Sequence, residues 1–365
     1  MDDFNIIEFL KKIVAEGASD AHLYAGEYPC MRKDGYIVKF SDTQRLTVDD
    51  LNKSIDILIP QHLKSRIDEY MDLDFAYEIQ GCSRFRVNLS RQINEKALVI
   101  RVISYNIKTI QELYLPAALR QFSMLNNGLV LFTGPTGCGK STTIAALINY
   151  INNNYPKHII TIEDPIEFIF TNNKSIISQR QVLLDTPTFP AGIKYALRQD
   201  PDVIFIGEIR DTETVISTLE AAETGHLVYA TIHTNDAIQT VNRIVNMFAR
   251  SERQYVREQL AQILRGTVAQ KLIPTTDGSG RRPACEVLVC TATIRDFIMK
   301  NELDQIYDLV KRGTFDNMLT LNHSLYQLVK AKSITQETAL EFSDNRNELS
   351  QMLRGVYHGA FAEWE

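Results

Sequence analysis

Residues 134–142 combine glycines, one lysine and hydroxyl side chains at a fixed spacing; they are Gly134, Pro135, Thr136, Gly137, Cys138, Gly139, Lys140, Ser141 and Thr142. In such a loop the small residues let backbone N–H groups close around phosphates, the lysine reaches the β and γ phosphates, and a hydroxyl holds Mg²⁺. An apolar run at 129–132 precedes the loop and a helix-forming run at 144–147 follows it. This context predicts binding of a nucleoside triphosphate with Mg²⁺.

The first acidic candidate follows a predicted strand at 158–162. Glu163 and Asp164 come directly after this strand, where a neighbouring parallel strand delivers acids to a bound nucleotide. Glu163 is predicted to act in catalysis and, partly through water, to hold Mg²⁺. The alternatives are that both acids are merely exposed at the strand end, and that Asp164, before Pro165, is only a turn residue.

The second acidic candidate follows the predicted strand 203–206. A Mg²⁺-binding aspartate and then a catalytic glutamate are expected here, but the chain has Gly207 and Glu208. Magnesium must therefore depend on Ser141, the phosphates, water and Glu163 or Asp164. Glu208 keeps the position for orienting or deprotonating the attacking water, unless it too is only exposed at a strand end.

Two histidines, His226 and His233, flank the strand-like run 227–232. Their separation places them on opposite faces of a strand, so they are not expected to be paired metal ligands. His233 ends a third strand, where a γ-phosphate sensor would lie. For His226 a structural imidazole and a functional one are both left open.

Arginines stand out in the first third of the chain. Alternation over 84–89 places Arg84 and Arg86 on one face of a strand, which is solvated or binds an anion. Arg101 interrupts the apolar run 97–103 and needs an anionic partner if it is buried. The alternative for Arg101 is a salt bridge to an acid of the same domain such as Asp72 or Asp74.

Hydrophobic patterning predicts an α/β protein with four regions. Residues 1–110 alternate short helix and strand signals, 111–122 form a connector, 123–290 alternate strands and helices around the loop, and 291–365 show amphipathic helix patterns. We therefore expect an α+β N-terminal domain, a phosphate-loop domain and a helical C-terminal tail.

Composition excludes several classes of protein. The 39 basic and 45 acidic residues give a formal net charge of −6, which makes nucleic acid an unlikely main partner. Five cysteines without paired spacing do not indicate disulfides or a zinc site. Asp2 and Asp3 stand where a signal peptide needs positive charge, and no apolar run approaches the ~20 residues of a membrane span. A cytoplasmic protein with only peripheral membrane contact is expected.

Four ordered segments together resemble the PilT family, the secretion-type ATPases that power type IV pilus retraction. The segments are GPTGCGKST at 134–142, IITIEDPIEF at 159–168, DPDVIFIGEIRD at 200–211 and AETGHLVYATIHT at 222–234. The SDAHL run at 19–23 and the strand at 84–88 extend the resemblance over almost the entire chain.

This resemblance implies a PAS-like N-terminal domain joined to a RecA-like ATPase domain, assembled as a ring of six with ATP between subunits. It also implies that arginines of the N-terminal domain approach the nucleotide, and that Gly207 is normal for the family. The positions that match its functional residues are Arg86 and Arg101, Glu163 in the acidic box, Glu208 in the Walker B position, and His226 and His233 in the histidine box. Cys138 replaces the usual serine, so we expect activity to survive but oxidation sensitivity to appear.

The resemblance also bears on which member of the family this is. Assembly ATPases carry a long extra N-terminal domain and usually a tetracysteine metal site; neither is present, which favours retraction. Residues 293–298 are similar to the AIRNLI-type helix of retraction ATPases, whereas 271–282 resembles the accessory paralogue PilU, so motor and auxiliary motor both remain open. The implied partners are further copies of the chain, an inner-membrane platform protein at the pilus base that Arg295 could touch, and a paralogous pilus ATPase.

Other classes remain as alternatives. Type IV secretion and DNA-uptake ATPases lie within the same superfamily. A RecA-like DNA motor shares the nucleotide fold, but the acidic net charge and the lack of an interleaved aromatic and basic strand argue against it. A non-catalytic ring that only binds ATP is disfavoured by the presence of Lys140 and Glu208.

Overall fold

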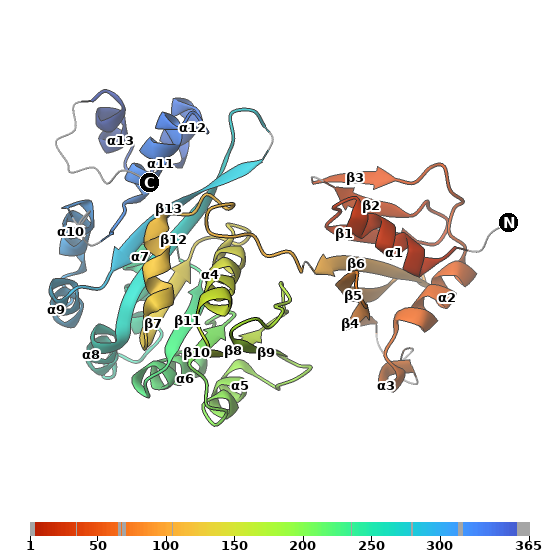
Figure 1. Ribbon diagram of the computed structural model, residues 1–365, viewed down its shortest axis with the longest axis horizontal. Helices are drawn as coiled ribbons and strands as arrows, with labels where there is room; N and C mark the ends of the chain where they lie inside the picture. The colour runs from red at the N-terminus through yellow and green to blue at the C-terminus, as the bar shows by residue number, and fades with distance from the viewer. Residues whose placement is uncertain are drawn as a thin grey trace. The chain divides into compact units, whose positions relative to one another are not determined.

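The computed structural model describes residues 4–33, 35–64, 67, 71–103, 105–234, 236–278, 280–312 and 317–355. The chain divides into two compact units, Met1–Asn106 with Glu167–Ile169, and Ile107–Ile166 with Phe170–Glu365. Each unit has its own sheet (Figure 1). Parts of the predicted C-terminal helical region, 313–316 and 356–365, lie outside the described residues.

The first unit is built on an antiparallel sheet. Among the described residues its six strands lie in the order β3-β2-β1-β6-β5-β4, with bounds β1 Asp20–Tyr24, β2 Cys30–Lys33, β3 Tyr36–Lys39, β4 Asp72–Ile79, β5 Ser83–Gln92 and β6 Glu95–Ile103. Its helices are α1 Ile6–Ala15, α2 Val48–Leu58 and α3 Gln61–Lys64. Leu10 and Ile55 from these helices pack against Phe85 and Ile100 in one core. The alternation predicted for 84–89 is confirmed, because every second residue of β5 from Ser83 to Leu89 is buried.

The second unit is built on a mostly parallel sheet. In the described part of the chain its seven strands lie in the order β13-β12-β7-β11-β10-β8-β9, with bounds β7 Gly128–Thr133, β8 His158–Glu163, β9 Ile176–Gln181, β10 Val203–Ile206, β11 Leu227–Ile232, β12 Leu264–Pro274 and β13 Arg281–Val289. Only the β12–β13 pair is antiparallel among the pairings of this sheet that the described residues form. All residues of β7, β10 and β11 are buried, as expected for parallel strands covered on both faces.

Helices cover both faces of this sheet (Figure 1). Their bounds are η2 Ala117–Met124, α4 Lys140–Asn154, α5 Phe189–Ala196, α6 Thr212–Glu223, α7 Ala237–Asn246, α8 Arg253–Ile263, α9 Ala292–Lys300, η3 Leu303–Gln305, α10 Ile306–Arg312, α11 Leu321–Lys330, α12 Gln336–Phe342 and α13 Arg346–Leu353. Phe132 and Val130 of β7 face the core shared with α4 and η2, whereas Leu129 and Leu131 face the core shared with α5 to α10.

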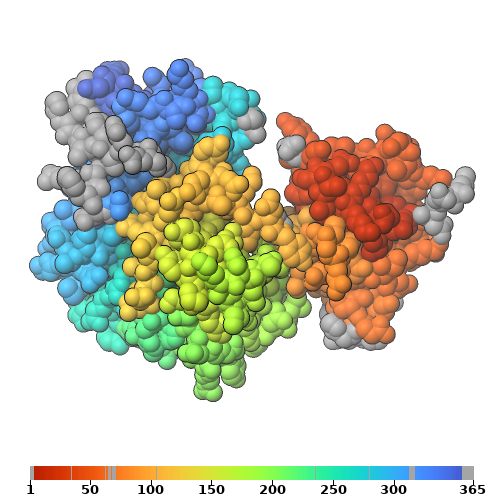
Figure 2. Space-filling view, in the orientation of Figure 1, coloured from red at the N-terminus to blue at the C-terminus, as the bar shows by residue number. Residues whose placement is uncertain are grey.

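Two regions differ in detail from the sequence expectation. The segment expected as a connector packs into the second unit, because Leu115, Leu119 and Phe122 are buried in the core beneath α4. Figure 2 shows η2 and α4 side by side on this unit's surface. The C-terminal helices form two groups: α9 and α10 join the main core, and α11 to α13 surround a separate cluster with Ile273 and Ala284. The predicted limits of the four regions, 1–110, 111–122, 123–290 and 291–365, stay predictions.

Candidate active site

The phosphate-loop segment connects the end of β7 directly to the start of α4. Gly134 has a φ of +138°, and a Cβ there would overlap the carbonyl oxygen of Gln270. Gly139 has a φ of +92°, and a Cβ there would lie 2.7 Å from Gln270 Nε2. Gly137 has a φ of +76° but open space around it. Left-handed backbone therefore favours glycine at all three positions, and two of them also lack room for any side chain.

Lys140 is held inside the loop. Lys140 is 8% exposed, and its Nζ donates to the carbonyl oxygens of Gly134 at 2.9 Å and Pro135 at 3.1 Å. Ser141 and Thr142 follow in the first helical turn and are half-buried. The positive charge of Lys140 and the amides at the start of α4 are thus concentrated at one place, which suits a polyphosphate.

Gln270 of β12 was not identified from the sequence, and it holds the loop in place. Its side chain accepts from Thr143 Oγ1 at 2.7 Å and donates to the Cys138 carbonyl at 2.8 Å. Gln270 is 4% exposed. The available signal was an amide within a strand-like segment, Val268 to Ile273, because a buried polar side chain must find partners.

Cys138 is buried in the loop, next to Lys140. The residue is 4% exposed, and burial raises the pKa of its thiol. The thiolate is the form that is oxidised, so a buried thiol with a raised pKa resists the reaction. This burial argues against the expected oxidation sensitivity of the loop, which stays a prediction. Cys138 fills space against Gly134, whose Cβ would lie 2.7 Å from its sulfur.

Glu163 ends β8 and is 6% exposed. Its Oε1 accepts from Thr161 Oγ1 at 2.7 Å and from Gln179 Nε2 at 3.4 Å. These two neutral donors orient the carboxylate. Asp164 is exposed beside it, and its Oδ2 lies 3.7 Å from Arg210 Nη1.

Glu208 lies directly after β10 in a network of charged side chains. Its Oε2 accepts from Arg210 through Nη2 at 2.7 Å and Nε at 2.8 Å, and its Oε1 lies 3.1 Å from His233 Nε2. The Glu208 side chain remains 21% exposed. Glu208 and His233 are predicted from separate motifs; the structure brings them together and adds Arg210, two residues after Glu208.

The end of β11 brings His233 to the loop. The next residue, Thr234, donates its backbone N–H to Thr133 Oγ1 at 3.0 Å, and Thr133 directly precedes Gly134. His233 itself is exposed. The carboxyl ends of β7, β8, β10 and β11 therefore gather the loop, Glu163, Glu208 and His233 at one edge of the sheet.

Gly207 occupies the expected aspartate position for a steric reason. A Cβ at this residue would lie 3.1 Å from Glu163 Cα and 3.2 Å from the Ile162 carbonyl oxygen. The neighbouring strand β8 is thus so close that a side chain at this position would require it to move by a few tenths of an ångström.

His226 lies at the other edge of the sheet. It precedes β11, six residues before that strand ends, which is roughly 20 Å at the rise of a β-strand. Its Nδ1 lies 3.0 Å from the Ala221 carbonyl oxygen and 3.1 Å from Thr224 Oγ1 at the end of α6. Within one chain His226 is therefore not part of the site around the loop, and the nucleotide contact expected for it is wrong. Its contacts favour the alternative, a structural imidazole.

Arg86 and Arg101 belong to the first unit and lie directly opposite each other on β5 and β6. Arg101 does pair with an acid of its own unit, but the acid is Asp20 at 2.8 Å, whereas Asp74 pairs with Arg86 at 3.4 Å. The Arg101 side chain is 66% exposed. The condition set in the sequence analysis, a buried guanidinium, is therefore not met.

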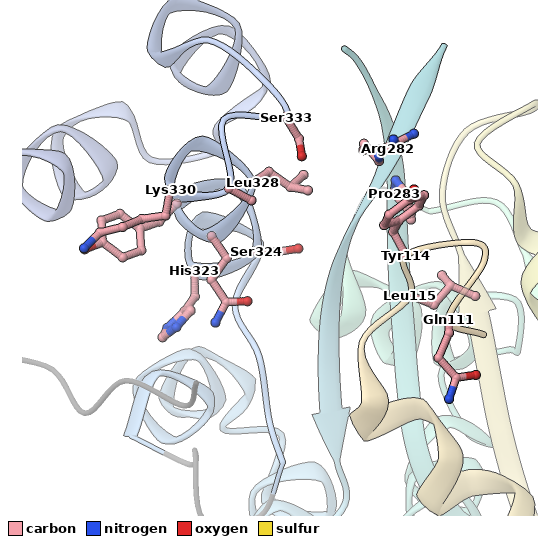
Figure 3. A pocket seen from close by; sticks show the side chains of 13 residues that line it. Gln111, Tyr114, Leu115, Arg282, Pro283, His323, Ser324, Leu328, Lys330 and Ser333 are labelled. Carbon is pink, nitrogen blue, oxygen red and sulfur yellow. The ribbon is translucent and has the colours of Figure 1, made fainter. Parts of the chain in front are cut away.

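The second unit has two cavities between the 111–115 segment and strand β13, and one of them adjoins the loop. One of about 400 Å³ is lined by Gly139, Thr142 and Gln270 together with Leu113, Tyr114 and Arg281. A larger one of about 780 Å³ lies between α11 and β13; Figure 3 shows His323 and Leu328 on one side and Tyr114 and Arg282 on the other. Among the described residues that line the larger cavity there is no carboxylate and no loop residue. The smaller cavity is the one that continues from the phosphate loop.

The oxygen donors at the loop suit Mg²⁺. Ser141 offers a hydroxyl and Glu163 a buried carboxylate, and both are hard oxygen ligands. The described residues contain no cluster of three or more histidine, cysteine or acidic side chains arranged to hold a metal. A magnesium ion bound mainly by phosphate oxygens and water, with one or two protein ligands, fits this set.

Comparison with known proteins identifies the family. Residues 5–282 match the family described as "Type II/IV secretion system protein". The chain belongs to this family. Two relatives from Pseudomonas aeruginosa are each 40% identical: the type IV pilus ATPase PilU, over 95% of this chain and 91% of the relative, and the type IV pilus retraction ATPase PilT, over 92% and 97%.

Solved structures agree with this membership of the secretion family. The crystal structure of the pilus retraction motor PilT with bound ADP superimposes with a TM-score of 0.89 at 44% identity, covering 96% of this chain and 100% of that one. The predicted resemblance and the predicted fold class, an α+β N-terminal domain followed by a phosphate-loop α/β domain with a helical tail, are confirmed. No described helix is long and apolar enough to cross a membrane.

Proposed function

We propose that this chain is an ATPase motor that hydrolyses ATP to drive type IV pilus retraction and twitching motility. The observation that carries the proposal is the gathering of Lys140, Glu163 and Glu208 at one edge of a parallel sheet. It is supported by relatives named as pilus ATPases that match over more than nine tenths of both chains. The site of action is the cytoplasmic face of the inner membrane, where the motor touches a platform protein at the pilus base.

In this mechanism each residue has one role. Lys140 and the amides of residues 134–142 neutralise the phosphates, and the cavity lined by Leu113 and Tyr114 receives the nucleoside. Glu208, oriented by Arg210 and His233, aligns the attacking water. Bound Mg²⁺ supplies charge neutralisation on the phosphate oxygens, and Ser141 and Glu163 would hold it.

The site is completed by a second copy of the chain. Arg86 and Arg101 of a neighbouring subunit stabilise charge that develops during transfer, in a homohexameric ring. Hydrolysis then changes the angle between the two units of a subunit and displaces the platform protein. Trapped ATP and ADP states with the same angle between the units would refute this motion.

The first experiment is phosphate release by purified protein over a range of protein concentrations. Glu208→Gln is expected to lower release about 100-fold or more, while the exposed Glu213→Gln on α6 leaves it unchanged. A specific activity that rises with protein concentration supports a site completed between subunits. Release that is independent of both concentration and Glu208 contradicts the proposal.

Complementation tests the role of the arginines. Lys140→Ala subunits lack a working loop but retain both arginines, and Arg101→Ala subunits have the opposite defect. If the arginine acts on a neighbour's nucleotide, mixing the two inactive proteins restores part of the activity. If it acts within its own subunit, the mixture stays inactive.

An accessory motor is the second candidate, because PilU and PilT of Pseudomonas aeruginosa are equally similar to this chain at 40% identity. A deletion strain separates the two. Loss of twitching with surplus surface pili is expected for the main motor. Retained retraction under low load points to an accessory role beside a paralogous ATPase, and cells without pili point to assembly.

A further inference from the structure

Charged side chains form one row across the outer face of the first unit's sheet. Arg86 on β5 lies opposite Arg101 on β6, Arg101 lies opposite Asp20 on β1, and Asp20 lies opposite Arg32 on β2. Residues directly opposite each other in antiparallel strands share a face, so these four side chains are lateral neighbours. We call them the arginine row.

Burial within the arginine row is uneven. Asp20 is 6% exposed, whereas the Arg101 side chain bonded to it is 66% exposed. Burying a carboxylate against a largely exposed arginine is an inefficient way to stabilise a fold, because the desolvation cost is large and the solvent-screened attraction is small. The pair instead anchors an exposed cationic group to a rigid strand.

The anchored atom matters. Arg101 donates to Asp20 Oδ1 through Nε at 2.8 Å. This contact fixes the plane of the guanidinium through Nε. The two terminal nitrogens, Nη1 and Nη2, then point the same way and can bind two oxygens of one phosphate side by side. Arg86 lies next to it, and its Nε lies 3.4 Å from Oδ1 of the exposed Asp74. Like charges directly opposite each other repel, and an anion between them would relieve that repulsion.

His22 lies two residues after Asp20 on β1, on the same face, and adds no competing positive charge. Burial, together with the charges of Arg32 and Arg101, lowers the pKa of His22. Its imidazole is therefore neutral at neutral pH. Lys39 on β3 also shares this face, but its Nζ lies 3.2 Å from Glu27 Oε2, so its charge is paired with an acid.

We propose that Asp20 is a positioning residue for Arg101: its buried carboxylate holds the guanidinium so that Arg101 and Arg86 together contact the triphosphate bound by a neighbouring subunit. This inference rests on the proposed function. It assigns a role to the SDAHL run at 19–23 that the phosphate-loop site does not use.

The test is a double-mutant cycle on ATP turnover by the full chain. Asp20→Ala is expected to lower kcat about 10-fold or more with a KM change below about twofold, since misplacing a transition-state contact costs rate rather than ground-state binding. The double variant Asp20→Ala, Arg101→Ala is expected to be no slower than Arg101→Ala alone. Asp20→Asn keeps an acceptor oxygen, so its kcat should lie between those of Asp20→Ala and the unaltered chain.

Controls separate positioning from folding. Asp74→Ala removes an exposed carboxylate bonded to the other arginine of the row and is expected to change kcat less than about twofold. Multiplicative losses in the double variant, or equal losses for Asp74→Ala and Asp20→Ala, would overturn the inference. If Asp20→Ala unfolds, Asp20→Asn decides: a lowered kcat with unchanged KM and unchanged melting temperature supports the inference, whereas an unaltered kcat, or a joint loss of kcat and melting temperature, refutes it.

The outcome for Arg101→Ala distinguishes two failures. If this variant turns over ATP normally, the proposed role of the arginine in hydrolysis is wrong and the inference falls with it. If it is inactive while Asp20→Ala is fully active, the proposed function stands and only the positioning role is refuted.

Discussion

The hydrogen bonds of Gln270 connect β12 to the phosphate loop, and their removal gives a quantitative prediction. The amide accepts from Thr143 Oγ1 at 2.7 Å and donates to the Cys138 carbonyl at 2.8 Å, both in buried surroundings. Gln270→Met keeps the length of the side chain but removes both contacts. The loop then loses its only described side-chain support from β12.

The magnitude follows from the groups left unpaired. An unsatisfied buried polar group costs about 1–3 kcal/mol, so two of them together cost about 2–6 kcal/mol if nothing relaxes. The Thr143 hydroxyl can turn to a carbonyl of the preceding helical turn, which leaves the Cys138 carbonyl as the main loss, about 1–3 kcal/mol. Part of this destabilises the fold and part loosens the loop, so we expect ADP to bind about 10-fold more weakly, equivalent to ~1.4 kcal/mol.

Calorimetric titration of ADP measures this effect directly. Gln262→Met, at an exposed position at the end of α8, is the matched control and should bind as the unaltered chain does. Tripolyphosphate should lose the same factor as ADP, because Gln270 acts on the loop and not on the nucleoside. Unchanged ADP affinity in a folded Gln270→Met protein would refute the reasoning, whether or not its melting temperature falls.

Three further predictions follow from the same unit. Gly207→Ala should lower kcat about 10-fold, because its Cβ would lie 3.1 Å from Glu163 Cα and displace Glu208. Gly207→Asp should have a kcat no higher than that of Gly207→Ala. Burial and the nearby charge of Asp236 raise the pKa of Glu286 on β13 from 4.5 to about 7. The folded chain therefore holds this proton more tightly than the unfolded chain, and stability is lost as pH rises through this window, by roughly 3 kcal/mol at most. Glu286→Gln should flatten the melting temperature between about pH 5 and pH 8. Cys138, buried with a raised pKa, should react with iodoacetamide more slowly than the half-buried Cys82, as followed by mass spectrometry of tryptic peptides.

Each of these has a clear contrary result. Wild-type kcat in Gly207→Ala would mean that β8 and β10 can separate without moving Glu208. A melting profile of Glu286→Gln parallel to that of the unaltered chain would mean that Glu286 is charged in the folded state at neutral pH. Faster alkylation of Cys138 than of Cys82 would restore the view of a redox-sensitive loop.

The nucleotide site was largely predictable because its signals are local in sequence. The loop from Gly134 to Thr142 lies between a fully apolar strand and a helix, and the strand ends at Glu163 and Glu208 follow from β-branched runs. In a parallel sheet the carboxyl ends of neighbouring strands share one edge, so short motifs suffice to place such residues together. His226 shows the limit of motif matching, since its position before the strand places it at the other edge.

Only the tertiary structure decided which residues support those motifs. Gln270 reaches the loop from a strand far along the chain. Asp20 and not Asp72 or Asp74 pairs with Arg101, and the close approach of β8 leaves little room for a side chain at Gly207. These relations depend on strand order and register, which bring together residues that are distant in sequence. A local sequence pattern does not predict either of them. The sequence thus determined the chemistry that the site can perform, and the packing of the strands determined which side chains hold it in position.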